Sequence, residues 1–232
     1  MTWKTWDELP PAMQTEELRR YYELLEKKQL TLKMKRGFDI IASLSLLLLL
    51  SPVFLTLGIA IRVDSEGPVF YRQERVTQYG RRFRIHKFRS MVSGADRKGS
   101  LVTVHNDARV TRVGRVIRKY RLDEIAQLID VLEGNMSFVG PRPEVPKYVA
   151  CYTPEMMATL LLPAGITSEA SIRYKDEDRL LDGAEDVDRV YVEQVLPEKM
   201  KLNLASLEKL SLREDLMTML RTVSAVSGKE YR

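Results

Sequence analysis

The chain has 232 residues, of which 44% are hydrophobic and 30% are charged. This length and composition suit one globular domain with a membrane element, and they exclude a disordered chain, because enough apolar residues are present to build a core. Cys151 is the only cysteine. An intramolecular disulfide is therefore excluded, nothing indicates an oxidising compartment, and we expect the main domain to be cytoplasmic.

Basic residues are concentrated in the middle of the chain. Between Arg62 and Arg121, sixteen Lys and Arg residues stand against five Asp and Glu, a local charge of +11, whereas the whole chain carries only +5. Such a block predicts an anionic partner, which could be the phosphates of a nucleotide, a nucleic acid or lipid head groups. A solvated basic face without a partner is the alternative.

The first part of the chain, residues 1–32, is predicted to be an extension that contains an amphipathic helix. The helix pattern covers residues 15–28, and Thr15 is placed to cap its start. Trp3 and Trp6 are expected either to lie at head-group depth or to pack on the domain. The N-terminus does not show the pattern of a cleaved secretory signal, so we expect the apolar run that follows to be retained. Packing or a homodimer contact are the roles we consider for this extension.

An uncharged apolar run extends from Ile40 to Ile61, a length of 22 residues. About 20 residues suffice to cross a hydrocarbon core of about 30 Å as a straight helix, so the length permits a span. Basic residues flank the run on both sides: Lys27, Lys28, Lys33, Lys35 and Arg36 precede it, and Arg62, Arg72, Arg75, Arg81 and Arg82 follow it. Because positive flanks favour the cytoplasmic side, both ends of the run are predicted to lie on that side.

A proline interrupts this run near its middle. Pro52 lacks an N–H and disfavours helical geometry at Ser51, so a helix is expected to break there, and the Ser51 hydroxyl can cover a carbonyl that the break frees. Residues 40–50 alone make about 16 Å of helix, which reaches about halfway into the core. We therefore predict a monotopic membrane protein with a re-entrant helix-break-helix over residues 33–62. A proline-kinked spanning helix and a buried hairpin of a soluble core are the alternatives.

The rest of the chain, residues 63–232, is predicted to be a cytoplasmic catalytic domain. Alternating apolar and basic residues favour two short strands, over residues 67–76 and 82–89, on either side of a turn at residues 78–80. Residues 94–106 are interpreted as a loop. Because helical patterns follow these strands, we expect an α+β domain that is helix-rich, with short strands.

Helical periodicity dominates the second half of the chain. It predicts helices over residues 113–120 and 123–132, and Gly134 is expected to end the second of these. Residues 140–143, Gly-Pro-Arg-Pro, must form a rigid loop. A capping box that starts at Ser211 precedes apolar residues at helical spacing, so a final amphipathic helix is predicted.

Two adjacent acids, Asp123 and Glu124, follow the basic block directly. On a helix both can line one pocket, although acids at a helix start also simply favour the positive end of the helix dipole. If the two acids line a pocket, we expect cations to surround them, namely Lys87, Arg89, Arg112, Arg115, Arg118 and Arg121. We expect these cations to hold both carboxylates ionised, and an ionised Asp can ligate Mg²⁺ or attack a phosphoryl group.

Other chemical motifs are excluded by spacing. His86 and His105 do not approach the spacing of metal ligands, so both are interpreted as structural or surface histidines. No Walker-type or Rossmann-type glycine loop occurs in the chain. A nucleotide must therefore be bound in another way.

Several short stretches of the chain follow one another in a characteristic order. They are Lys35-Arg-Gly-Phe-Asp39, the Ser51-Pro52 break, Phe70-Tyr-Arg-Gln-Glu-Arg75, Lys87-Phe-Arg-Ser-Met91, Arg121-Leu-Asp-Glu124 with Gln127-Leu128, and Asn135-Met-Ser-Phe-Val-Gly-Pro-Arg-Pro143. Each stretch is a weak signal alone, but their order and spacing are specific. Together they resemble the bacterial sugar transferase family, the small monotopic phosphoglycosyl transferases, from Lys33 to about Val226.

The resemblance implies a two-step reaction that initiates cell-surface glycan biosynthesis. A sugar 1-phosphate would move from a UDP-sugar to polyprenyl (undecaprenyl) phosphate. Asp123 would be the nucleophile, so that a covalent aspartyl sugar-phosphate forms and UMP is released. Asp123 and Glu124 would together hold Mg²⁺, the expected cofactor, with the division of roles between them left open.

The resemblance also assigns residues to the phosphates of the substrates. Lys87, Arg89 and Arg118 match the family's phosphate-side positions, and Arg142 lies in its Gly-Pro-Arg-Pro loop. Many members have Pro-Gly-Ile-Thr-Gly where this chain has Pro163-Ala-Gly-Ile-Thr-Ser168. The donor sugar is therefore not fixed by the family, and Arg173 is our candidate for a donor contact.

A protein of another class would also explain the basic block. A membrane-tethered binding protein could dock nucleic acid or anionic lipid there without chemistry, and its binding would fall steeply as salt rises. That reading does not account for the Asp-Glu pair and the Gly-Pro-Arg-Pro loop at family spacing. We therefore expect an enzyme at the cytoplasmic face of the bacterial inner (plasma) membrane, whose partners are the two substrates and the lipid bilayer, not nucleic acid.

Overall fold

The computed structural model describes residues 3–95, 108–177 and 186–226. Within this part the fold is helix-rich with a few short strands, which confirms the α+β class. The α-helices are α1 (Glu16–Glu26), α2 (Gln29–Leu49), α3 (Ser51–Asp64), α4 (Arg112–Lys119), α5 (Gln127–Glu133), α6 (Pro146–Val149), α7 (Glu169–Arg173), α9 (Val187–Val190), α10 (Leu196–Glu208) and α11 (Leu212–Val226). The strands are β1 (Phe70–Val76), β2 (Arg82–Phe88), β3 (Met136–Val139) and β4 (Ala164–Thr167).

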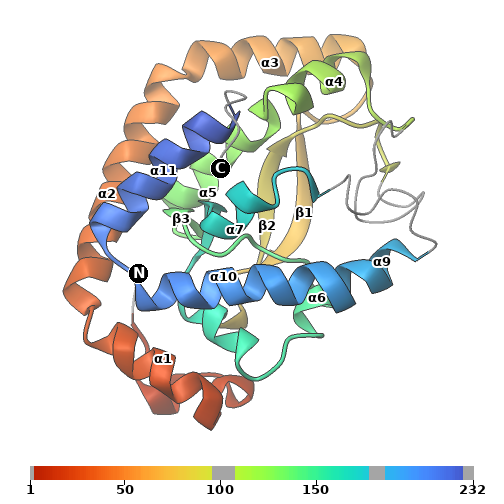
Figure 1. The fold of residues 1–232 in the computed structure, drawn as a ribbon. Coiled ribbons are helices and arrows are strands. Elements are labelled where there is room, and N and C mark those ends of the chain that lie inside the picture. The colour runs from red at the N-terminus through yellow and green to blue at the C-terminus, as the bar shows by residue number, and fades with distance from the viewer. Residues whose placement is uncertain (1–2, 96–107, 178–185, 227–232) are drawn as a thin grey trace.

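Strands β1 and β2 form the hairpin predicted from the sequence (Figure 1). They pair in antiparallel fashion, so that Tyr71 lies opposite Lys87 and Gln73 lies opposite Ile85. The turn between them places Tyr79 at φ 58° and Gly80 at φ 73°, a left-handed geometry that reverses the chain. Figure 1 shows the hairpin at the centre of the molecule with helices on its flanks.

Strands β3 and β4 form a second, parallel pair that the sequence analysis did not predict. Each has four residues, which is too short for a clear alternation of apolar and polar side chains. Their ends meet at two glycines, because a Cβ added to Gly165 would lie 2.1 Å from the backbone nitrogen of Gly140. Glycine is therefore required where the Gly-Pro-Arg-Pro loop leaves the sheet.

The N-terminal extension packs on the domain. Leu9, Met13 and Leu18 share one buried cluster with Leu161 and Leu207 from the second half of the chain. Both tryptophans of the extension lie partly buried against the same cluster, which favours the packing alternative over head-group depth. Burial of this apolar surface is the main stabilising contribution of the extension.

Local contacts in α1 differ from the sequence prediction. Thr15 precedes the helix, but its side chain forms no capping hydrogen bond. Arg20 forms an ion pair with Glu155, 3.1 Å away in a distant part of the sequence, and Arg19 pairs with Glu23 one turn later in the same helix at 3.3 Å. The helix is therefore held by both tertiary and local ion pairs.

Helices α2 and α3 meet at a bend of 61°. No single helix in the described part of the chain has the length and apolar character to cross a membrane, whereas this bent pair taken together has both. The Ser51 hydroxyl donates to the carbonyl of Leu48, 2.8 Å away, as predicted for a break at Ser51 and Pro52. Figure 1 shows the pair as an angular frame along two sides of the molecule.

One stripe of α2 attaches this frame to the domain, and it is polar. Lys35 forms an ion pair with Asp215 of α11, with a distance of 2.5 Å between Nζ and Oδ2. Arg36 donates to the carbonyls of Val131 and Leu132 at the end of α5. The charged residues that begin the family-like stretch on α2 therefore connect it to both α5 and α11.

The opposite faces of the bent pair are apolar and exposed. Asp39 and Ser43 continue the inward stripe of Lys35 and are buried. The exposed residues are Leu30, Met34, Phe38, Ile40, Ile41, Leu44, Leu48 and Leu49 on α2, and Val53, Leu55, Ile59 and Val63 on α3. A helix of a water-soluble protein has the reverse pattern, with its apolar stripe inward.

Replacement of Lys35 with Met is expected to destabilise the fold. The Lys35 and Asp215 side chains are only 6% and 13% exposed, so removal of the cation leaves a buried carboxylate without its partner. The expected loss of stability is about 3–5 kcal/mol. The apparent melting temperature in detergent micelles measures this loss.

Lys33→Met on the same helix is the matched control, because Lys33 is exposed. A Lys35→Met, Asp215→Leu double variant should recover most of the lost stability, since no buried charge then remains unpaired. Equal melting temperatures for Lys33→Met and Lys35→Met would show that the ion pair does not stabilise the junction.

Candidate active site

Asp123 and Glu124 lie on a short 3-10 helix, η5 (Leu122–Ala126), which precedes α5. The sequence predicted a regular helix over residues 123–132, but the α-helical part begins only at Gln127. Arg121, between α4 and η5, has a backbone φ of 51°. A left-handed conformation is uncommon for a residue with a side chain, and such residues cluster at functional sites. Both acids are half-buried at the resulting turn.

Glu124 is held by two cations from different elements. Arg142, in the loop after β3, donates to its Oε1 at 2.6 Å, and Lys87 of β2 lies 3.4 Å from the same oxygen. The Glu124 side chain is only 14% exposed. The structure therefore brings together four of the residues predicted from the sequence: Asp123, Glu124, Lys87 and Arg142.

The electrostatic environment shifts the pKa values of the two acids in opposite directions. Burial alone would raise the pKa of Glu124, but Arg142 and Lys87 outweigh it and hold that pKa well below the ordinary range. Burial raises the pKa of Asp123, and the neighbouring charge of Glu124 adds to the rise, while Lys87 and Arg118 oppose it. The expectation that both acids are firmly ionised therefore holds for Glu124, while the pKa of Asp123 moves in the opposite direction.

This difference predicts the acidic limb of the pH profile. A nucleophilic carboxylate acts in its ionised form, and the raised pKa of Asp123 means that it is protonated at a higher pH than an ordinary aspartate. If Asp123 is the nucleophile that the resemblance implies, activity is expected to fall as the pH drops through this raised pKa. Glu124→Gln removes a neighbouring negative charge, so it should lower the Asp123 pKa and move the acidic limb to lower pH.

The measurement is the rate of product release as a function of pH for the unmodified protein and for Glu124→Gln. An unchanged position of the acidic limb would show that Asp123 is not the group that titrates. The overall rate of the variant is expected to be lower, so the comparison uses the position of the limb and not its height.

Arg118 and Arg173 lie closer to the surface. Arg118 is half-buried in the last turn of α4, and its charge lowers the pKa of Asp123, which places it beside the acid turn. Arg173 is exposed at the end of α7 and forms no hydrogen bond or ion pair with any residue that the structure describes. Both are accessible for a further anionic partner.

Arg89 lies in a different environment from Lys87. Its guanidinium donates to the carbonyls of Ser65 and Glu66, each 2.6 Å away, and to that of Ile61. These carbonyls belong to the end of α3 and the chain that follows it, and Arg89 is only 5% exposed. The structure therefore places Arg89 at the junction between α3 and β1, and none of the hydrogen bonds recorded for it reaches Glu124.

Arg75 belongs to the site but was not singled out from the sequence. Its Nη1 donates to the carbonyl of Pro143, 3.0 Å away, and its Nη2 donates to Gln73. Burial lowers the pKa of Arg75, and its charge also lowers that of Lys87, so the two cations are neighbours. Strand alternation was the available signal, because Gln73, Arg75 and Lys87 lie on the same face of the hairpin.

His86 is a structural histidine, as predicted, whereas His105 lies outside the described residues. Asp130 accepts hydrogen bonds from the His86 backbone N–H at 2.8 Å and from its Nδ1 at 2.9 Å. Arg72 contacts Nε2, so both ring nitrogens have partners. Glu133 also approaches, which gives three possible ligand atoms within 4.8 Å. Sequence spacing did not reveal this cluster. Because Nδ1 lies against Asp130 and Nε2 against Arg72, both ring nitrogens are engaged by protein partners, which favours a structural role for His86 over metal binding.

The acid pair has a donor set that suits Mg²⁺. Both hydrogen bonds to Glu124 end on its Oε1 atom, and no side chain among the described residues donates a hydrogen bond to the Asp123 carboxylate. Magnesium is typically held by one or two carboxylates, while waters and substrate phosphates complete its coordination. Asp123 and Glu124 would be the residues that hold it.

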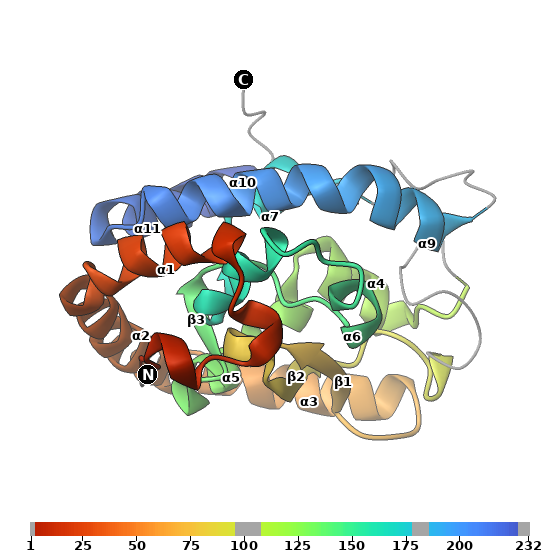
Figure 2. The same cartoon turned by 90° about the horizontal axis from the view of Figure 1, so that it is seen from below.

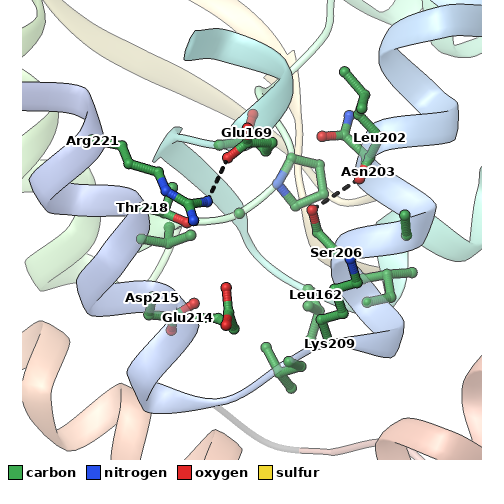
Figure 3. Close-up of a pocket in the computed structure, with 17 residues that line it drawn as sticks. Leu162, Glu169, Leu202, Asn203, Ser206, Lys209, Glu214, Asp215, Thr218 and Arg221 are labelled. Atoms are coloured by element: carbon green, nitrogen blue, oxygen red, sulfur yellow. Dashed lines mark hydrogen bonds and ion pairs between the residues drawn. The ribbon is translucent and has the colours of Figure 1, made fainter. Parts of the chain in front are cut away.

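A cavity of about 410 Å³ lies apart from the acid pair, between α10 and α11 (Figure 3). Arg221 and Glu169 form an ion pair at 3.2 Å across it, and Gly140 and Pro141 contribute to its wall. None of the site residues predicted from the sequence lines it. The cavity therefore borders the strand-to-loop segment that leads to Arg142, without reaching the acid turn.

The comparison with known families shows to which family the chain belongs. The profile described as "Bacterial sugar transferase" matches residues 30–229, which is most of the chain. The chain belongs to the bacterial sugar transferase family. The resemblance seen in the sequence is therefore confirmed.

Several named bacterial proteins are similar to this chain. The putative undecaprenyl-phosphate N-acetylgalactosaminyl 1-phosphate transferase of Bacillus subtilis (strain 168) is 38% identical over 159 residues, which cover 68% of this chain and 87% of the relative. The UDP-glucose:undecaprenyl-phosphate glucose-1-phosphate transferase of Caulobacter vibrioides is 34% identical over 195 residues, which cover 83% of this chain and 69% of the relative.

Some relatives are much longer than this chain. The UDP-N-acetylgalactosamine-undecaprenyl-phosphate N-acetylgalactosaminephosphotransferase of Aeromonas hydrophila is 47% identical over 116 residues, which cover 50% of this chain and 27% of the relative. The exopolysaccharide production protein PSS of Rhizobium leguminosarum is matched over 56% of its length. Different sugars appear in these names, so family membership does not identify the donor of this chain.

Proposed function

We propose that this protein transfers a sugar 1-phosphate from a UDP-sugar to polyprenyl (undecaprenyl) phosphate at the cytoplasmic face of the bacterial inner membrane. The product would be a diphosphate-linked lipid sugar, and UMP would be released. The names of the relatives support the reaction class. The observation in this chain that carries the proposal is the acid pair, in which Arg142 and Lys87 hold Glu124 while Asp123 remains available beside it.

The first step uses Asp123 as the nucleophile. A carboxylate oxygen of Asp123 forms a bond to the β-phosphorus of the UDP-sugar, the bond from that phosphorus to the bridging oxygen breaks, and UMP leaves with the electron pair. A raised pKa marks a more basic carboxylate, which favours attack, and half-burial limits competing water. Lys87, Arg142 and Arg118 supply positive charge where the phosphoryl oxygens gain negative charge.

The second step regenerates the acid. A phosphate oxygen of the polyprenyl phosphate attacks the same phosphorus, the bond to Asp123 breaks, and the diphosphate product leaves with the carboxylate restored. Bound Mg²⁺ would supply neutralising charge for the diphosphate. Glu124 keeps its negative charge throughout, because its two cationic partners hold its pKa well below neutral pH.

The bent helix pair supports contact with the bilayer. Its polar stripe, Lys35, Asp39 and Ser43, faces the domain, while its outer faces expose leucine and isoleucine side chains. Exposed apolar surface of this extent is unfavourable in water and favourable in lipid. We propose that α2 and α3 enter the membrane and return, so that both flanks of basic residues stay on the cytoplasmic side.

Replacement of Pro52 with Ala is expected to reduce the bend between α2 and α3. The alanine restores a backbone N–H and removes the ring clash with the preceding turn, so a continuous helix becomes more favourable. Membrane topology measures this change. Lys33→Cys and Glu66→Cys, each in a Cys151→Ser background, place a thiol at an exposed position before and after the apolar run. An impermeant maleimide added to spheroplasts then reports which face each thiol occupies.

With the break intact, both thiols should react only after the membrane is permeabilised. In Pro52→Ala, a fraction of molecules should expose one of the two thiols on the outer face. If the two positions already lie on opposite faces with Pro52 present, the re-entrant proposal is wrong and the kinked spanning helix is correct.

Intact-protein mass spectrometry tests the proposed reaction. The purified protein is incubated with Mg²⁺ and a panel of UDP-sugars, and parallel samples contain EDTA or the Asp123→Asn variant. A mass increase equal to one sugar phosphate, absent from both parallel samples, is the expected result. No adduct with any donor, together with no UMP release when polyprenyl phosphate is added, would favour a membrane-tethered binding protein, whose association with anions weakens steeply with salt.

A further inference from the structure

Arg121 connects the acid turn to a second segment of the site. Its backbone is left-handed, with φ 51°, two residues before Asp123. Its Nη2 donates to the carbonyl of Lys175, 2.8 Å away, across 54 residues of sequence. Its charge also helps to hold the pKa of Glu124 low, so the guanidinium lies near the acid pair.

The segment that Arg121 reaches is the turn Tyr174–Glu177, which follows α7. This turn is anchored at three points. The Tyr174 ring packs on the buried cluster that contains Tyr148 and Tyr191, the Lys175 carbonyl accepts from Arg121, and the Glu177 carboxylate accepts from the buried Lys199 at 2.8 Å. A turn held at its start, middle and end is a defined wall and not a loose connection.

The same turn also approaches the other cation of the site. The charge of Glu177 contributes to the raised pKa of Arg142, the residue that holds Glu124. The turn is therefore bonded to one cation of the site, Arg121, and its carboxylate acts electrostatically on another, Arg142. Arg173, exposed and directly before the turn, extends this wall with a cation that has no partner among the described residues.

The arrangement of the elements indicates which substrate meets this wall. On one side of the acid turn, Ala126 shares a buried cluster with Ile61 of α3 and Ile117 of α4, so this side adjoins the bent helix pair. On the other side, Lys199 of α10 holds the Tyr174–Glu177 turn. Figure 2 shows α10, with α7 beneath it, on the side of the molecule opposite α3, and Figure 1 shows α7 between α3 and α10. A lipid-anchored acceptor must come from the side of α3, so the water-soluble donor takes the side of α7 and α10.

We infer that Arg121 is a positioning residue for the nucleotide-sugar donor, because it fixes the Tyr174–Glu177 turn against the turn that carries Asp123. This inference rests on the proposed function. When the diphosphate lies at Lys87 and Arg142, the rest of the donor extends toward the wall that Arg121 fixes. Without the guanidinium, the wall and the nucleophile are no longer connected, and donor binding weakens while the acceptor side is unaffected.

Arg121→Asn is the variant that tests this inference. Asparagine tolerates the left-handed backbone better than most residues, so the turn can keep its conformation while the bond to Lys175 is lost. The full-length protein in nanodiscs is expected to show an increase of about tenfold in the KM for the UDP-sugar, as for the loss of one hydrogen bond from a charged donor. The KM for polyprenyl phosphate and the melting temperature should stay close to those of the unmodified protein.

Two further variants make the comparison specific. Arg121→Lys keeps the charge and one donor, so it should recover part of the donor affinity. Arg84→Asn is the matched control, because Arg84 is also an exposed arginine that donates to a backbone carbonyl, that of Arg72, but on the outer face of the hairpin. Its donor KM should not change.

The outcomes separate this inference from the proposed function. If the unmodified protein releases no UMP with any UDP-sugar, the proposed function fails whatever Arg121 does. If it releases UMP, and Arg121→Asn has an unchanged donor KM or raises the KM values for both substrates equally, the positioning role is wrong and the proposed function stands.

Discussion

Replacement of Asp123 with Asn is expected to abolish both the sugar-phosphate adduct and the release of UMP. The amide keeps the shape of the side chain but lacks the charge and the nucleophilic oxygen that the first step requires. Loss of a covalent nucleophile typically costs several powers of ten in rate, so a fall of at least about 10⁴-fold is expected. No other change in this chain is expected to have a larger effect on activity.

The same substitution is expected to leave the protein as stable as before, or to stabilise it. Burial raises the pKa of Asp123 in the fold, which means that the ionised form is disfavoured there relative to the unfolded chain. A group with a raised pKa contributes stability while it is protonated, and loses that contribution as the pH rises through the folded pKa. At neutral pH the uncharged Asn therefore avoids the free-energy cost of burying an ionised carboxylate. The native Asp123 would accordingly lower the stability of the fold in return for activity.

The measurement combines three readouts on one preparation: adduct mass, UMP release and melting temperature. Loss of activity with an equal or higher melting temperature supports a chemical role for Asp123. Loss of activity with a much lower melting temperature would point to a structural role. Appreciable activity that remains in Asp123→Asn would assign the nucleophile to another residue, and Glu124→Gln would then be examined in the same assay.

The elements that the sequence predicted well are those with local signals. The β1–β2 hairpin follows from alternating side chains around a turn, and Gly134 ends α5 with φ 84°, as its position suggested. Ser211 accepts from the backbone of Glu214 at the start of α11, which is half of the predicted capping box. Each of these features depends on residues a few positions apart, so one sequence was enough to find it.

The features that the sequence could not predict depend on distant contacts. Lys87 and Arg89 are two positions apart, yet one faces Glu124 and the other is bound to carbonyls at the end of α3, because β2 ends at Phe88 between them. The left-handed backbone of Arg121 leaves no pattern in the residue types. The parallel pairing of β3 with β4 joins four-residue strands more than 20 positions apart in the chain.

These contacts connect the bent helix pair to the chemistry. Arg36 on α2 donates to the carbonyls of Val131 and Leu132 at the C-terminal end of α5, at 2.5 and 2.9 Å. The N-terminal end of α5 follows directly from the 3-10 helix that carries Asp123 and Glu124. The orientation of the acid turn is therefore tied to the helix pair that we propose enters the membrane. In the proposed reaction, this connection would hold Asp123 at a fixed position relative to the lipid-anchored acceptor.

Replacement of Arg142 with Met is expected to be the second most damaging change. Arg142 donates to Glu124 Oε1 at 2.6 Å, and without it Glu124 keeps only the longer contact with Lys87 at 3.4 Å. The pKa of Glu124 should then rise, and Lys87 should be drawn toward Glu124 and away from the phosphates. Removal of one such preorganised charge typically lowers kcat by about 10²–10³-fold. The loss of stability is expected to be about 1–3 kcal/mol, the cost of a buried polar group that has lost its partner.

A double-mutant cycle with Glu124→Gln distinguishes two ways in which Arg142 could act. If Arg142 works mainly by holding Glu124, the two changes affect the same interaction, and the double variant should lose little more activity than Arg142→Met alone. If Arg142 contacts the transferred phosphoryl group independently of Glu124, the two losses should add on a logarithmic scale. The 2.6 Å contact and the opposite pKa shifts of the two partners favour the first outcome. Arg142→Lys should fall between Met and the native residue, because lysine restores the charge without the planar donor geometry of the guanidinium.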